Sequence, residues 1–107
     1  MVVIVFRTRV RPDADQAEMA RLGGRMYELA SAMPGFVSYK DFSAEDGESV
    51  SIVEFESQAT LQAWRMHPEH VQAQQRGREA MFDSYRIRVC ETVREYAFAA
   101  KPETQRR

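Results

Sequence analysis

Apolar and polar positions divide the first third of the chain into two patterns. Residues 2–10, "VVIVFRTRV", are rich in β-branched side chains and predict a β-strand. From residue 19 to 33, apolar side chains recur every three or four positions, which predicts an amphipathic helix of about 18 residues. Asp15 and Glu18 resemble a capping box at its start. The sequence "MPG" ends it, because proline and glycine stop helices.

The middle of the chain predicts a β-hairpin. Residues 36–44 and 49–57 both alternate in the manner of strands. Between them lies Asp46-Gly47, a dipeptide that is a strong signal for a tight turn. The two strands are therefore expected to pair with each other.

The last part of the chain predicts two helices and a strand. Ser57 is expected to cap a short helix that includes Leu61 and Trp64. Proline suits the first helical turn, so another helix is predicted from Pro68 to about Ser84. Alternation over 85–98 predicts a long last strand. The order β-α-β-β-α-α-β is the split βαβ or ferredoxin-like arrangement, an α+β fold with a four-stranded antiparallel sheet.

Length and charge limit the class of protein. A chain of 107 residues predicts one domain, assigned to 1–98, with a short C-terminal tail over 99–107. Hydrophobic residues make up 44% and charged residues 29%, as is ordinary for a globular protein. The 15 basic and 16 acidic residues give a net charge of −1 and form no basic block. This balance argues against nucleic acid as a partner.

The N-terminus and the cysteine usage bear on location. The first apolar run spans only six residues before Arg7 and has no basic lead, so neither a signal peptide nor a membrane span is expected. Cys90 is the single cysteine, which excludes an internal disulfide. The sequence thus predicts a cytoplasmic protein with no membrane partner.

The predicted sheet is apolar on both of its faces. Right-handed crossovers place both helical segments on one face, so the helices cover only that face. Burying each further apolar side chain is worth about 1.5–3 kcal/mol. A homodimer packed sheet against sheet is therefore predicted; the alternative is that a few apolar side chains stay exposed, as is common in monomers. In residues 50–55, Val50 and Ile52 point one way while Val53 and Phe55 point the other; in the first strand, Val3 and Val5 oppose Val2, Ile4 and Phe6.

The segment "WRMHPEHVQAQQRGR", 64–78, holds the candidate chemistry, including both histidines and the single tryptophan. Helical periodicity places His70 on the face that turns toward the sheet, together with small residues. His67 precedes Pro68 and is expected outside the helix. A two-histidine helical metal motif needs i, i+4 spacing and a third ligand, so "HPEH" predicts no metal site.

Each candidate residue has more than one interpretation. His70 is a core histidine bonded to a backbone carbonyl, a general base or substrate-orienting donor, or a haem ligand. Trp64 is a core anchor or a pocket wall for a planar substrate. Tyr39, which shares a strand face with Asp41, donates a proton or fills the core.

Three further residues raise questions of packing. Gly23 and Gly24 inside the first helix are interpreted as sites of close packing against the sheet, with a hinge as the alternative. Glu54, on a sheet face, needs a partner, for which the candidates are Arg7, Arg86, Arg88 and Arg94.

Four segments together resemble the antibiotic biosynthesis monooxygenase (ABM) domain family over about residues 2–98. They are "MPGFVSYKDF", "DGESVSIVEFES", "LQAWRMHPEHVQAQQRGR" and "YRIRVCETVREYAF". The resemblance implies a dimeric α+β barrel with a pocket between helices and sheet. It implies oxidation of a small aromatic or quinone-like molecule by dioxygen, without metal, flavin or other cofactor. His70 is then the base, and His67, Trp64 and Tyr39 orient the substrate.

Two alternatives accompany this resemblance. One is a small-ligand-binding barrel of the same fold with no oxidative chemistry. The other is haem binding or degradation, which the sequence disfavours. That branch uses an Asn on the first strand, absent here, and a Trp where Phe55 falls. Its ligand histidine matches a position nearer Gln74 than His70.

Overall fold

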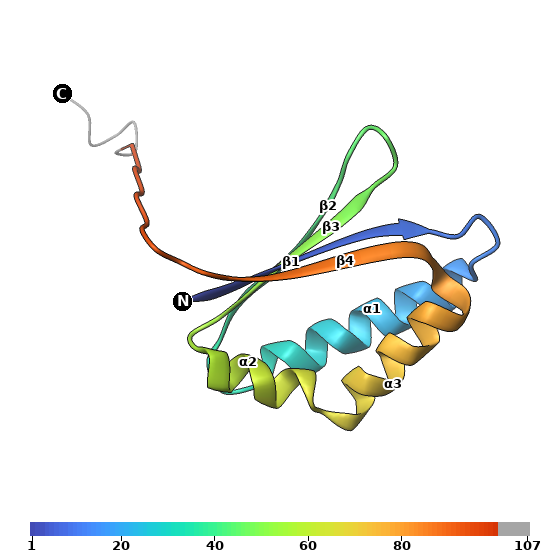
Figure 1. Ribbon diagram of the computed structural model, residues 1–107, viewed down its shortest axis with the longest axis horizontal. Coiled ribbons are helices and arrows are strands. Elements are labelled where there is room, and N and C mark those ends of the chain that lie inside the picture. The colour runs from blue at the N-terminus through green and yellow to red at the C-terminus, as the bar shows by residue number, and fades with distance from the viewer. Residues whose placement is uncertain (101–107) are drawn as a thin grey trace.

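A computed structural model describes residues 1–100 of the chain as one antiparallel sheet covered on one face by helices (Figure 1). The strands lie in the order β2-β3-β1-β4. This confirms the predicted α+β ferredoxin-like fold; the predicted tail, 99–107, lies outside the described residues from 101 onward. The strands are β1 (Val2–Val10), β2 (Phe36–Ser43), β3 (Ser49–Phe55) and β4 (Phe82–Glu91). The helices are α1 (Gln16–Ser31), α2 (Gln58–Arg65) and α3 (Pro68–Arg76), followed by a π-helical turn, Gly77–Met81.

Short polar side chains cap α1 and α2, as the sequence predicts, but the Glu18 side chain binds Arg76 of α3 instead of completing the expected capping box with Asp15. The Asp15 carboxylate accepts a hydrogen bond from the Glu18 amide at 3.0 Å. Ser57 and Thr60 form a reciprocal capping box at the start of α2. Each cap satisfies backbone groups that a helix end leaves without partners. In residues 1–100, none of the helices is long and apolar enough to span a membrane.

The last strand begins and ends earlier than predicted. The helix expected to reach Ser84 ends at Met81, and β4 starts at Phe82, whose ring lies over Gly77. A Cβ on residue 77 would come within 2.8 Å of that ring, so the glycine allows this sharp exit. At the other end, Glu91 pairs with Val2, the first residue of β1. The predicted strand 85–98 stops there because β1 offers no further partner.

The sheet carries apolar side chains on both faces, as predicted. The inner face, against the helices, carries Val53 and Phe55, exposed by 2% and 0%. The outer face holds four valine and isoleucine side chains that remain partly exposed, with Phe42 beside them at 52% exposure. The buried core comprises Val2, Ile4, Leu29, Ala30, Val53, Phe55, Leu61 and Trp64.

Glu54 does not take the arginine partner expected from the sequence. The Ser38 hydroxyl donates to the Glu54 carboxylate at 2.9 Å instead. Register explains the difference, because Arg7 lies opposite Val50 and forms its ion pair with Glu48 at 3.1 Å. The expected partner is therefore wrong.

The glycines of α1 do not pack closely against the sheet, contrary to the prediction. Apart from the backbone of α1 itself and the adjacent residues, a Cβ built on Gly23 or Gly24 would meet no heavy atom of residues 1–100 within 4 Å. Gly35, by contrast, does require glycine. Its φ of +82° lies in the left-handed region, and an added Cβ would come within 2.5 Å of the Thr60 side chain.

Two glycine substitutions should therefore have opposite effects on stability. Gly35→Ala combines a left-handed backbone with a clash and should lower the free energy of unfolding by about 2 kcal/mol or more. Gly24→Ala places a better helix former in open space and should raise it by up to about 1 kcal/mol. Urea unfolding of both variants tests this. A Gly35→Ala protein as stable as wild type would contradict the assigned strain.

Candidate functional site

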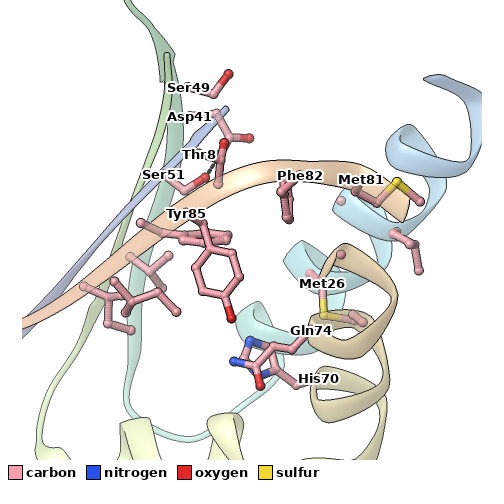
Figure 2. Close-up of a pocket in the computed structure, with 18 of the residues that line it drawn as sticks. Thr8, Met26, Asp41, Ser49, Ser51, His70, Gln74, Met81, Phe82 and Tyr85 are labelled. Carbon is pink, nitrogen blue, oxygen red and sulfur yellow. Dashed lines mark hydrogen bonds between the residues drawn. The ribbon is translucent and has the colours of Figure 1, made fainter. Parts of the chain in front are cut away.

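A cavity of about 280 Å³ lies between the inner face of the sheet and helices α1 and α3. This volume is close to the lower end of the range of small-molecule sites, about 300–1,000 Å³. Its middle is lined by apolar side chains, among them Ile4, Phe6, Met26, Val53 and Ile87. Polar groups gather at two ends, one around His70 and one around Asp41 (Figure 2).

Two arginine–carboxylate pairs join the helices that roof the cavity. Arg25 of α1 binds Glu69 of α3 through two hydrogen bonds of 2.6 and 2.7 Å. Arg76 of α3 binds Glu18 of α1 at 2.7 and 2.9 Å. The guanidinium groups hold the pKa values of Glu69 and Glu18 below their usual range. These bidentate pairs fix the two helices relative to each other across the roof.

Small residues on the roof leave the space open. Gly23 of α1, Ala73 of α3 and Gly77 of the π turn all line the cavity. At Gly23 the missing side chain leaves free volume rather than a tight contact. The glycine that sequence reasoning assigned to packing thus contributes to the shape of the cavity.

His70 projects from the first turns of α3 into the cavity wall, as its helical position predicts. Its Nδ1 atom lies 3.4 Å from the Arg65 carbonyl oxygen. Because a carbonyl oxygen only accepts hydrogen bonds, this contact favours the tautomer with a proton on Nδ1. The Nε2 atom then carries the lone pair. His70 therefore combines the predicted backbone contact with a nitrogen able to accept a proton.

Burial lowers the pKa of His70 below its ordinary value of 6.5. The hydrogen bond with the Arg65 carbonyl opposes this shift, while the charges of Arg65 and His67 add to it. The imidazole is consequently neutral at neutral pH, which is the form that acts as a base.

Trp64 is both a core residue and part of the cavity wall. Its side chain is 5% exposed and stacks on Phe55, with 5.6 Å between ring centres and 24° between ring planes. The His70 ring centre lies 4.3 Å from that of Trp64. Among residues 1–100, the buried Nε1 atom of Trp64 has no hydrogen-bond partner. The contacts show the indole supporting the imidazole from within the core.

Of the two remaining predicted site residues, the structure brings one to the cavity. Tyr39 lines it and packs edge-on against Trp64 at 6.3 Å. Burial raises the pKa of Tyr39, and the Asp41 charge raises it further. His67 lies outside the cavity lining, at the start of α3, where its Nδ1 accepts a hydrogen bond from the Glu69 amide at 3.1 Å.

Sequence reasoning missed two polar residues beside His70. Figure 2 shows the Tyr85 hydroxyl pointing toward His70 and Gln74. Arg78 donates a hydrogen bond of 3.1 Å to the same hydroxyl. The alternation of Tyr85, Ile87 and Val89 along β4 is the signal for this position, since all three side chains line the cavity. This alternation predicts the position of Tyr85 only once the register of β4 with β1 is known.

A second polar group lies at the other end of the cavity. It consists of side chains from three neighbouring strands, here called the rim cluster: Thr8 of β1, Asp41 of β2, and Ser49 and Ser51 of β3. Figure 2 shows these four residues apart from His70 and Gln74. Within residues 1–100, no three His, Cys, Asp or Glu side chains gather as a metal site requires.

Fold and cavity together define a small α+β protein with an apolar cavity between its sheet and its helices, and comparison with known proteins gives its family. The family model for antibiotic biosynthesis monooxygenase matches residues 1–76. The uncharacterized protein YqjZ of Bacillus subtilis is 32% identical over 96 residues, covering 90% of this chain and 82% of YqjZ. The chain therefore belongs to the antibiotic biosynthesis monooxygenase family, which confirms the resemblance seen in its sequence.

Solved structures share the fold. Rv0793 from Mycobacterium tuberculosis aligns with a TM-score of 0.78 at 24% identity, covering 90% of this chain and 98% of Rv0793. SnoaB from Streptomyces nogalater, a cofactor-independent oxygenase, aligns with a TM-score of 0.72 at 17% identity. That match covers 88% of this chain and 94% of SnoaB.

The lowered pKa of His70 predicts a pH-dependent contribution to stability. Between the folded pKa and 6.5 the unfolded chain binds a proton that the folded chain does not. The contribution should be complete above about pH 6.5 and be lost as the pH falls through the folded pKa. Urea unfolding of wild type and His70→Gln between about pH 8 and about pH 5 isolates this difference. An NMR titration in which His70 protonates at or above its ordinary pKa would contradict the shift.

Proposed function

We propose that the protein is a cofactor-independent monooxygenase that oxidises a small aromatic or quinone-like molecule with dioxygen. The observation that carries the proposal is His70, a neutral imidazole in the wall of a largely apolar cavity, with Nδ1 against a backbone carbonyl. Family membership supports it, as does the shared fold with SnoaB, itself a cofactor-independent oxygenase.

The proposed reaction begins with proton transfer. A phenolic hydroxyl of the substrate gives its proton to Nε2 of His70, which leaves an electron-rich phenolate. The phenolate passes one electron to dioxygen, and the resulting substrate radical and superoxide combine to form a carbon–oxygen bond at the para position. The peroxide anion takes the proton back from His70, and loss of water, which removes the hydrogen of the para carbon, leaves a quinone. The sum is phenol plus dioxygen giving quinone plus water, and the substrate supplies all the electrons.

The cavity supplies what such a reaction needs from a protein. An apolar lining excludes water from the reactive anion, and the close walls hold the substrate in one orientation. Trp64 keeps the imidazole in place through the ring contact at 4.3 Å. Tyr39, whose raised pKa keeps its hydroxyl protonated, is a donor for the substrate oxygen.

Loss of the base should abolish oxygen consumption. His70→Ala should reduce oxygen uptake with a panel of phenols and hydroquinones by at least about 100-fold, the usual contribution of a general base. Gln72→Ala, on the exposed side of α3, is the matched control and should retain activity. An oxygen electrode measures both. Unchanged uptake in His70→Ala would refute the assigned role, and thermal stabilisation by these compounds without uptake would identify a binding protein instead.

We also propose that the protein works as a homodimer whose subunits pack sheet against sheet. The outer face of the sheet, opposite the helices, has partly exposed Val3, Val5, Val50 and Ile52 at its centre. After β4 the chain leads away from the sheet (Figure 1) and exposes Val93, Tyr96 and Phe98 by 89%, 83% and 91%. A second copy of the chain buries both surfaces at once, and two-fold symmetry is the usual way to do so.

A charge on the outer face should separate the subunits. Val5→Arg places a guanidinium at the centre of the proposed interface, where its burial without a partner is unfavourable. Val71→Arg makes the same change on an exposed position of α3, with 45% exposure, and is the control. Light scattering should give twice the chain mass for wild type and Val71→Arg, and a single chain for Val5→Arg. A wild-type protein that is monomeric at micromolar concentration would exclude this dimer.

A further inference from the structure

The rim cluster is assembled by the register of three strands rather than by neighbouring residues in the sequence. Asp41 of β2 lies opposite Ser51 of β3, and Ser49 of β3 lies opposite Thr8 of β1. Paired residues of an antiparallel sheet share a face, so all four side chains belong to the inner face. Figure 2 shows them together, away from His70.

The rim cluster offers mainly hydrogen-bond acceptors. The Ser51 hydroxyl donates to Oδ1 of Asp41 at 2.5 Å, which commits the serine proton to the carboxylate. An ionised carboxylate has only acceptor sites, about four in all, so Asp41 retains capacity for a further donor. Thr8, exposed by 7%, is the deepest member and adds a hydroxyl to the same end.

The neighbouring arginines are engaged elsewhere. Arg7 pairs with Glu48 and Arg9 with Asp46. Both belong to the opposite face from Thr8, because side chains alternate along β1. Among the ion pairs within residues 1–100, none involves Asp41. Asp41 is exposed, and it gives this end of the cavity a negative charge that no ion pair within the described residues neutralises.

We propose that the rim cluster is a specificity site that binds a hydrogen-bond donor, a hydroxyl or an ammonium group, on the end of the substrate remote from the phenol. The inference rests on the proposed function, since it assigns the reacting phenol to His70. Asp41 lies two residues, about 7 Å, beyond Tyr39 along β2. Tyr39 in turn contacts Trp64, which supports His70. A rigid apolar body of roughly two fused rings fills the middle and joins the two polar ends.

A matched pair of naphthols tests this assignment. The probe 6-(aminomethyl)-2-naphthol carries an ammonium group, and 6-ethyl-2-naphthol has a methyl group of nearly the same size in its place. The ammonium group favours the Asp41 end, because Arg65 and Arg78 lie near His70. Isothermal titration calorimetry should show wild type binding the ammonium probe at least about tenfold more tightly than the ethyl probe.

Two variants assign the preference to Asp41. Asp41→Asn keeps the size of the side chain and removes its charge, so the tenfold preference should fall to about threefold or less, with binding of the ethyl probe little changed. Glu45→Gln removes a charge from the hairpin turn, outside the cavity lining, and should leave the preference intact. This control separates contact with Asp41 from general attraction of a cation.

The result also separates the rim cluster from the proposed reaction. His70→Gln should lower oxygen uptake while leaving the preference for the ammonium probe unchanged. If wild type consumes no oxygen yet shows the Asp41-dependent preference, the proposed function fails and the rim cluster stands. Equal binding of the two probes by wild type, a preference that survives Asp41→Asn, or no binding of either probe would overturn the inference.

Discussion

Pairing of β1 with both of its neighbours is the constraint on which the rest of the structure depends. Val2 faces Phe55 on one side and Glu91 on the other, and this alignment continues along the strand. Because side chains alternate, a slip of one residue would move every inner side chain to the outer face. The same alignment sets the core, the floor of the cavity and the length of β4. Which residues line the site is therefore decided first by the register of the strands.

The hydrophobic pattern was sufficient to predict most of the fold, because buried side chains recur with a different period in strands and in helices. Caps and turn dipeptides then placed most element ends to within a few residues. The pattern was wrong at the junction after α3. There the exit from the helix depends on a ring packed over Gly77, a contact between residues five positions apart that no periodicity reveals. The expected partner of Glu54 was wrong for a related reason, since charge alone does not say which residue lies opposite.

The candidate site, too, could be predicted from the sequence only in part. Helical periodicity was sufficient to turn His70 toward the sheet, and strand alternation was sufficient to put Tyr39 and Asp41 on one face. Tyr85 and Thr8 lie opposite each other on β4 and β1, and their shared place in the cavity follows from that pairing. Sequence therefore predicts the residues that one element presents, whereas residues joined across elements require the register.

Gly23 influences the volume of the cavity separately from the stability of the fold. Gly23 leaves free volume in the cavity because it has no side chain, although the backbone of α1 does not need a glycine at this position. A single added methyl group at this position would occupy part of the cavity without contacting the side chains of the sheet within residues 1–100. The volume of the cavity is thereby uncoupled from folding, because one substitution on α1 changes it while the sheet stays the same.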